Sequence, residues 1–236
     1  MYRRLDAARI ESTAVALARR VDERFPGSGL SKVAAELVGV VQEAQRRCAW
    51  VAEPKLLLRV GLGLIVLALI SIVAASLATI EIRGGELTWP ELVQVSEAGI
   101  NDVVLLGLAL LFLFSIEKRM KRKRALAGLH ELRAMAHVID MHQLTKDPER
   151  LTPQGPDTAS SPKQVLTAFE LTRYLDYCSE MLALIGKSAA LYGQYLDDEV
   201  VLAAVTEIEG LTAGLSNKIW HKINAVELYR QRHGLV

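Results

Sequence analysis

Residues 60–80 constrain this chain most, because about 21 consecutive positions carry no charged side chain. A helix that rises 1.5 Å per residue crosses the roughly 30 Å hydrocarbon core of a bilayer in about 20 residues. The stretch begins about 60 residues into the sequence, which is too late for a signal peptide. It therefore predicts a transmembrane helix over about residues 58–80.

A second apolar stretch, residues 103–116, has about 14 uncharged positions, which is short for a transmembrane helix. Extending it outward past Asp102 and Asn101 gives about 19 residues. We therefore predict a second span over about residues 98–117, joined to the first by a short outer loop, residues 81–97. Asp102 would then lie at the outer interface of the membrane. The alternative is an acidic group that functions inside the membrane.

Lysine and arginine residues gather at one end of each predicted span. Before the first span lie Arg46, Arg47, Lys55 and Arg59, and after the second lie Lys118, Arg119, Lys121, Arg122, Lys123 and Arg124. The outer loop holds one cation, Arg83, and four glutamates. Since cationic residues favour the cytoplasmic side, we predict a multi-pass protein of the cell inner (plasma) membrane with cytoplasmic N and C termini.

The six basic residues that follow the second span predict contacts with anionic lipid headgroups. Nucleic-acid binding is the weaker interpretation, because the basic run adjoins the membrane and contains no aromatic side chain. The net charge of the chain is only +1, and we expect no nucleic-acid partner.

Outside the two spans, apolar residues recur at steps of three and four, which is typical of amphipathic helices. No segment alternates with a period of two. The predicted fold is therefore all-α: a two-helix transmembrane hairpin with a long-helix cytoplasmic bundle. Its predicted parts are cytoplasmic amphipathic helices (1–53), the transmembrane hairpin (54–117), a polybasic juxtamembrane helix (118–145), a Pro-rich loop (146–161) and a cytoplasmic helical hairpin (162–236).

The apolar stripes extend over several heptads, more than a small monomer easily buries, and they predict a homo-oligomer. Gly210 and Gly214 lie inside the last predicted helix, where each costs about 1 kcal/mol relative to alanine. We expect close helix packing at this point to compensate.

Three of the five histidines fall in the predicted juxtamembrane helix. With about 100° between successive residues, His130, Arg133, His137 and Asp140 share one quadrant of that helix, and His142 follows. Two imidazoles and a carboxylate suit zinc or another divalent metal, whereas imidazolium groups with Arg133 suit an anionic ligand. The alternative is a solvated face or a set of interhelical hydrogen bonds, with no cofactor.

Polar and aromatic residues on the next long helix are candidates for a second wall facing this histidine stripe. They are Arg173, Tyr174, Asp176, Tyr177 and Glu180. Ordinary exposure on the helix surface is the alternative.

The tripeptide Gly186-Lys187-Ser188 matches the end of a phosphate-binding loop. Met181, however, stands where such a loop needs a glycine, and the periodicity around it is helical, so we exclude nucleotide binding there. Cys48 and Cys178 lie far apart in segments predicted to be cytoplasmic. They predict buried free thiols rather than a disulfide or a zinc site.

The layout of helices, a two-span hairpin and a helical C-terminal part resembles, in topology alone, the two-span effector domains of bacterial conflict systems known as SLATT. Topology does not establish function. We expect a non-enzymatic membrane protein whose cytoplasmic helices mediate self-association and sense a protein partner or ligand. The alternatives are a membrane-anchored metal-dependent enzyme that uses His130, His137 and Asp140, and an oligomeric membrane effector or pore.

Overall fold

The computed structural model describes residues 4–79, 89–151, 159 and 166–232. Over these residues the chain forms α-helices and one short 3-10 helix, with no strand, so the predicted all-α class is confirmed. The elements are α1 (Ala7–Arg24), α2 (Gly29–Ala52), α3 (Leu56–Thr79), α4 (Trp89–Leu144), η1 (Pro148–Leu151), α5 (Ala168–Tyr195) and α6 (Glu199–Arg232).

The chain divides into two compact units. One, which we call the apolar unit, is residues 53–121. The other, the helical bundle, is residues 1–52 together with residues 122–236. The long helix α4 contributes residues to both units, and each unit is described by itself below.

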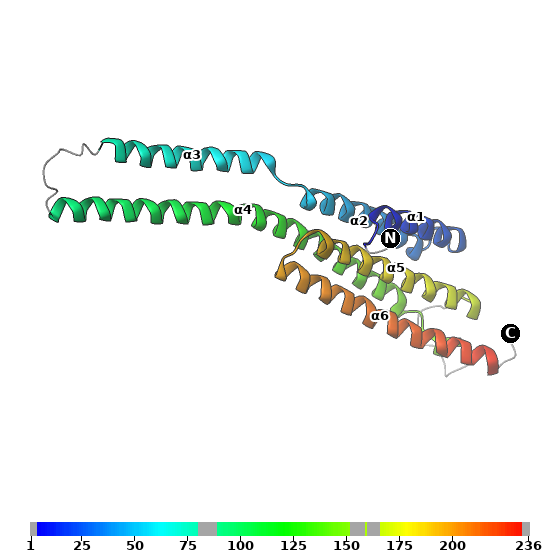
Figure 1. Ribbon diagram of the computed structural model, residues 1–236. Helices are drawn as coiled ribbons and strands as arrows, with labels where there is room; N and C mark the ends of the chain where they lie inside the picture. The colour runs from blue at the N-terminus through cyan, green and yellow to red at the C-terminus, as the bar shows by residue number, and fades with distance from the viewer. Residues whose placement is uncertain (1–3, 80–88, 152–158, 160–165, 233–236) are drawn as a thin grey trace. The chain divides into compact units, whose positions relative to one another are not determined.

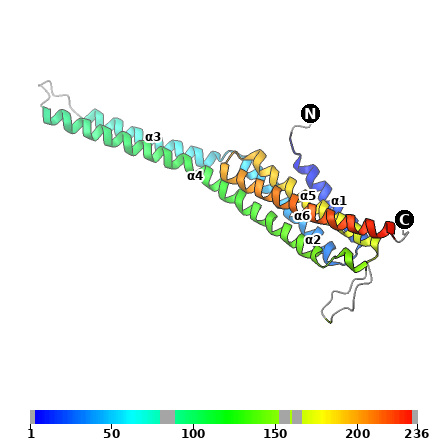
Figure 2. The ribbon, with the colours of Figure 1, turned by 90° about the horizontal axis from the view of Figure 1, so that it is seen from below.

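In the apolar unit, α3 and the first part of α4 lie side by side (Figures 1 and 2). Residues 80–88, which include positions 81–88 of the predicted outer loop, lie outside the described residues, and the rest of that loop, from Trp89, is already part of α4. Within the described residues, one stretch, Gly99–Leu144, is long and apolar enough to cross a membrane, by length and composition. Its most apolar window has a mean hydropathy of 2.2, and none of that window is buried.

The helical bundle is organised around α5, which packs against α1, α2 and α6 (Figures 1 and 2). A helix that is apolar on most of its surface belongs in the centre of a bundle. Accordingly, Leu175, Met181 and Ile185 of α5 are completely buried. α6 lies along one side of α5 and follows it through a short connection that ends at Asp198.

The first two helices form from clear local signals. Asp6 caps α1 by accepting hydrogen bonds from the backbone N–H groups of Ala8 and Arg9. The apolar stripe of α1 is buried, with Leu17 1% exposed. A turn then connects α1 to α2, and Gly27 in it has φ +66°, a conformation that glycine adopts without steric cost.

The helix after the Pro-rich loop, α5, begins behind a complete capping box. The sequence favours a start near residue 162, but residues 160–165 lie outside the described residues and α5 begins at Ala168. Thr167 caps it: its hydroxyl accepts from the backbone N–H of Glu170, whose carboxylate accepts from the backbone N–H of Thr167. This complete capping box gives a hydrogen-bond partner to two backbone N–H groups at the start of α5.

Candidate functional site at the end of α4

The last carbonyl groups of α4 are bound by side chains from two other helices. The hydroxyl of Tyr174 on α5 donates to the carbonyl of His142 over 3.3 Å. The ammonium group of Lys222 on α6 donates to the carbonyls of Gln143, over 2.9 Å, and Lys146, over 3.2 Å. The final carbonyls of a helix lack intrahelical partners and carry a partial negative charge, so a cation is well placed here.

Further polar groups surround this point, which we call the α4-terminus cluster and define as Asp140, His142, Gln143, Lys146, Tyr174, Cys178 and Lys222. Gln143 is only 2% exposed, and its Nε2 donates to Asp140 Oδ1 over 2.7 Å. Its Oε1 is buried and has no hydrogen-bond partner among the described residues. A buried acceptor without a partner costs free energy. A ligand or partner that donates a hydrogen bond to this oxygen would therefore stabilise the cluster.

Burial shifts the pKa values of three groups in the cluster, Lys222, Tyr174 and Cys178. Desolvation lowers the pKa of Lys222, while Asp147 and Asp140 act against that shift. Burial also raises the pKa of Tyr174, and it raises the pKa of the Cys178 thiol to about 12. Because the thiolate is the nucleophilic form, Cys178 at neutral pH is an inert thiol and not a catalytic nucleophile.

Aromatic rings and cations extend the cluster towards α1. The ammonium of Lys146 lies 5.3 Å from the ring centroid of Tyr174. Phe25 meets Tyr174 edge-to-face at 5.6 Å between centroids. Arg20 and Arg173 both approach the ring of Tyr177, at 5.9 and 5.8 Å from its centroid. Such pairs favour particular orientations of the rings, so they define the side-chain packing at this end of the bundle.

The residues of the predicted histidine stripe lie on the continuous helix α4 and differ in their exposure and partners. His130 and His137 are exposed, and so is Arg133, which pairs with Glu207 of α6 at 3.3 Å. In this quadrant of α4, Arg133 therefore reaches α6, whereas the side chains of His130 and His137 are exposed. Asp140 is half-buried and turned to Gln143.

His142 lies on a different side of α4, against the start of α2. A Cβ placed on Gly29 would lie 2.7 Å from its Cε1 atom, so glycine is what allows the imidazole to approach. No group of three or more His, Cys, Asp or Glu side chains in the described part of the chain is placed to hold a metal ion. The metal or anion site predicted for the stripe therefore stays a prediction.

Of the predicted second wall, Tyr174 does reach the end of α4, whereas Tyr177 turns to the α1 side of the bundle. Gln143 and Lys222 were missed by sequence reasoning. Lys222 carried a usable signal, because it lies three residues after Ile219 and four before Val226, on the edge of the apolar stripe of α6.

The basic residues after the second apolar stretch have mixed roles. Lys118, Arg119 and Lys123 are exposed, as headgroup contact requires. Lys121 pairs with Glu117 at 3.0 Å, and the guanidinium of Arg124 lies 4.5 Å from the ring centroid of Trp50.

Arg122, which the sequence also predicts to contact headgroups, forms an ion pair with Asp198 of the helical bundle. Its Nε and Nη2 atoms bind both carboxylate oxygens of Asp198 at 2.7–3.0 Å. This pairing raises the pKa of Arg122. The guanidinium therefore links α4 to the start of α6.

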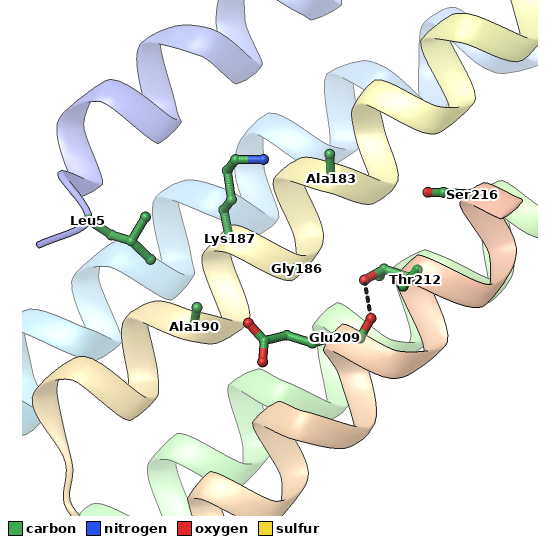
Figure 3. Close-up of a pocket in the computed structure, with 9 residues that line it drawn as sticks. Leu5, Ala183, Gly186, Lys187, Ala190, Glu209, Thr212 and Ser216 are labelled. Atoms are coloured by element: carbon green, nitrogen blue, oxygen red, sulfur yellow. Dashed lines mark hydrogen bonds between the residues drawn. The ribbon is translucent and has the colours of Figure 1, made fainter. Parts of the chain in front are cut away.

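Two adjoining cavities on the other side of the bundle share Leu5, Ala183 and Lys187. One, of about 410 Å³, lies between α5 and α6 (Figure 3). The other, of about 420 Å³, lies between α1 and α5. The first is lined by Leu5, Ala183, Gly186, Lys187, Ala190, Glu209, Thr212, Ala213 and Ser216.

Lys187 projects from the middle of α5 beside the first cavity, and Glu209 projects from α6 (Figure 3). Because Gly186, Lys187 and Ser188 are helical, their backbone N–H groups are engaged in the helix and do not cradle a phosphate. This geometry agrees with the exclusion of a nucleotide-binding loop. Comparison with models of protein families, with curated proteins and with solved structures finds no match for this chain.

Proposed function

We propose that this chain is a two-span integral membrane protein of the inner (plasma) membrane. Both termini are cytoplasmic, and the helical bundle mediates self-association and senses a protein partner or ligand. The observation that carries the membrane part is the exposed apolar surface of α3 and of the first half of α4. Water does not tolerate a continuous surface of this kind, whereas lipid chains cover it at no cost.

The exposed fractions are large along both helices. On α3, Leu64 is 62% exposed and Leu67 is 60% exposed. On α4, Val103 and Leu111 are each 70% exposed and Phe112 is 61% exposed. A core helix of a water-soluble protein buries such side chains, so exposure along both helices supports two spans rather than a soluble fold.

The charged residues support the orientation. Lys118, Arg119 and Lys123 are exposed just beyond the apolar part of α4 and suit contact with anionic headgroups. Apolar side chains on the bundle surface support self-association: Met141 is 68% exposed, Trp220 is 59% exposed and Leu228 is 56% exposed.

Cysteine labelling in cells tests the orientation. Ser96 and Ser12 are both exposed, and the native thiols of Cys48 and Cys178 are buried, so background labelling is low. We expect a membrane-impermeant maleimide to label Ser96→Cys on intact spheroplasts and Ser12→Cys only after permeabilisation. The opposite order, or a chain recovered from the soluble fraction, would reject the proposal.

Self-association is tested on the purified full-length chain in detergent micelles. Mass photometry is expected to give a mass of at least two chains at concentrations where the bundle is folded. A strict monomer over the whole accessible concentration range contradicts this part of the proposal.

A further inference from the structure

The helix α6 turns a long face away from the bundle core, and that face is short of charge. With about 100° between successive residues, the residues of this face lie within about 60° of Gly210 around the helix axis. We call it the α6 outer face and define it as Ala203, Thr206, Gly210, Ala213, Gly214, Asn217, His221, Asn224, Ala225 and Leu228. Every one of these residues is exposed. The buried residues of α6, such as Ile208 and Ile219, lie on the opposite side.

Gly210 and Gly214 form an open notch in the middle of this face. A Cβ placed on either residue would meet nothing within 4 Å. The packing predicted to compensate for these two glycines is therefore not supplied by the chain's own described residues, which corrects that expectation. Gly186, by contrast, lies against a neighbouring helix, because its Cβ position is 3.1 Å from the hydroxyl of Thr212. Glycines four residues apart on one helix face allow another helix to approach closely.

The polar side chains of the face are of a particular kind. An exposed helix face normally carries lysine and glutamate, whereas the cores of protein interfaces are depleted of charge. Here the uncharged polar residues are a threonine, a histidine and two asparagines, and between residues 203 and 228 the one charged residue within the same 60° is Glu207, which pairs with Arg133 of α4 at 3.3 Å. A carboxamide both donates and accepts a hydrogen bond, so it binds well to an identical carboxamide.

The spacing of residues on the face favours one arrangement of two α6 helices. The face has a seven-residue repeat, as in a two-stranded coiled coil, formed by Ala203, Gly210, Asn217 and Asn224. In a parallel pair, each of these residues lies opposite the same residue of the second chain. Lysines or glutamates at these positions would repel one another, because they carry the same charge. Asparagine at such a position selects a parallel, in-register pair. Trp220, 59% exposed beside the face, supplies apolar area at the margin of the contact.

We propose that the α6 outer face binds the same face of a second copy of this chain, with the two α6 helices parallel, in register and in contact at Gly210 and Gly214. The inference rests on the self-association in the proposed function and assigns it a surface. Asn217 and Asn224 then form carboxamide pairs with their own copies across the twofold axis.

Disulfide cross-linking in native membranes tests the register. A parallel in-register pair brings the two copies of residue 217 within the roughly 4.4–6.8 Å Cα separation that a disulfide spans. Asn217→Cys is therefore expected to give a covalent dimer on oxidation, and Ser12→Cys, which is exposed on α1, is expected to stay monomeric. A dimer that forms only when Ala203→Cys and His221→Cys chains are mixed would show an antiparallel pair and overturn the proposal.

A notch-filling substitution tests the contact separately. In Gly210→Leu and Gly214→Leu the new side chain meets nothing in its own chain, so the bundle is expected to fold and melt at or above the wild-type temperature. The dimer dissociation constant is expected to rise at least tenfold. Gly39→Leu, at an equally open glycine of α2, is the matched control and is expected to leave dimerisation unchanged.

The outcomes separate this inference from the proposed function. A wild-type chain that is monomeric removes the self-association on which the inference rests. If the wild-type chain associates, Gly210→Leu and Gly214→Leu associate equally strongly and Asn217→Cys gives no cross-link, the α6 outer face is rejected as the contact surface. The proposed self-association itself is not affected by that result.

Discussion

Arg122 and Asp198 form a two-pronged ion pair that ties α4 to the first turn of α6. The Asp198 side chain is fully buried and the Arg122 side chain is 37% exposed. The same carboxylate also accepts hydrogen bonds from the backbone N–H groups of Val200 and Val201, so it caps α6 as well. One buried carboxylate thus joins two helices and starts one of them.

Removing the cation of this pair is expected to destabilise the bundle. Breaking a fully buried ion pair costs roughly 3–5 kcal/mol because a charge is left without its partner. Arg122 is partly exposed, so we expect Arg122→Ala to lower the free energy of unfolding by less than the loss of a fully buried pair, measured by urea unfolding followed by circular dichroism. Arg122→Lys is expected to recover only part of the loss, because an ammonium does not bind both oxygens in the same fork geometry. Equal stability of Arg122→Ala and wild type would show that the Arg122–Asp198 pair does not stabilise the bundle.

The contact between Lys222 and the end of α4 predicts a local effect. Lys222→Met removes the donor to two carbonyls, and we expect a loss of about 1–3 kcal/mol. Hydrogen exchange is expected to rise first at the amides of residues 140–146. Lys218→Met, on an exposed position one turn earlier in α6, is the control and is expected to change stability by less than about 0.5 kcal/mol. Equal exchange in the two variants would show that Lys222 does not hold the end of α4.

Gly128 allows α4 to approach Tyr192 of α5. An added Cβ would collide with the Tyr192 hydroxyl and lie 2.8 Å from its Cζ atom, so Gly128→Ala is expected to cost about 1–3 kcal/mol. Gly39→Ala, which meets nothing, is expected to gain up to about 1 kcal/mol from helix propensity. The two melting temperatures should therefore move in opposite directions. A stabilised Gly128→Ala variant would contradict the close contact.

The buried thiols predict how stability depends on alkaline pH. Burial raises the pKa of Cys48 and of Cys178 to about 12, whereas an unfolded thiol titrates near 8.5. The folded state therefore holds these protons more tightly, and the stabilisation, complete below about pH 8.5, is lost as the pH rises towards 12. Above about pH 8.5 each thiol lowers the unfolding free energy by up to about 1.4 kcal/mol per pH unit. Cys48→Ala/Cys178→Ala is expected to have a shallower slope between pH 8.5 and 10, and equal slopes would contradict it.

The exposed histidines give a test of the metal hypothesis. Because His130 and His137 are exposed, His137→Ala is expected to change stability by less than about 0.5 kcal/mol. Elemental analysis of the purified chain is the measurement. Stoichiometric metal that disappears in His137→Ala would establish a metal site on the stripe, and a chain without metal would reject it.

Much of the bundle was predictable because its signals are local. The stripe of α1 from Ile10 to Val21 and the role of Asp198 at the start of α6 follow from periodicity and from capping chemistry, which depend on neighbours within four residues. The start of α5 at Ala168 was not predicted, because the capping box of Thr167 and Glu170 was not recognised, and the predicted start near residue 162 lies outside the described residues.

The sequence by itself determined the all-α class of this fold: long apolar stretches, amphipathic helices with a three-to-four repeat, and buried thiols. These properties depend on composition and local spacing. Only the tertiary structure decided which polar groups meet: Lys222 with the end of α4, and Arg122 with Asp198, whereas His130 and His137 meet solvent. Those pairings join residues about 75–80 positions apart in the chain. Such pairings depend on how helices rotate about their axes when their apolar faces pack, and no local pattern specifies that rotation.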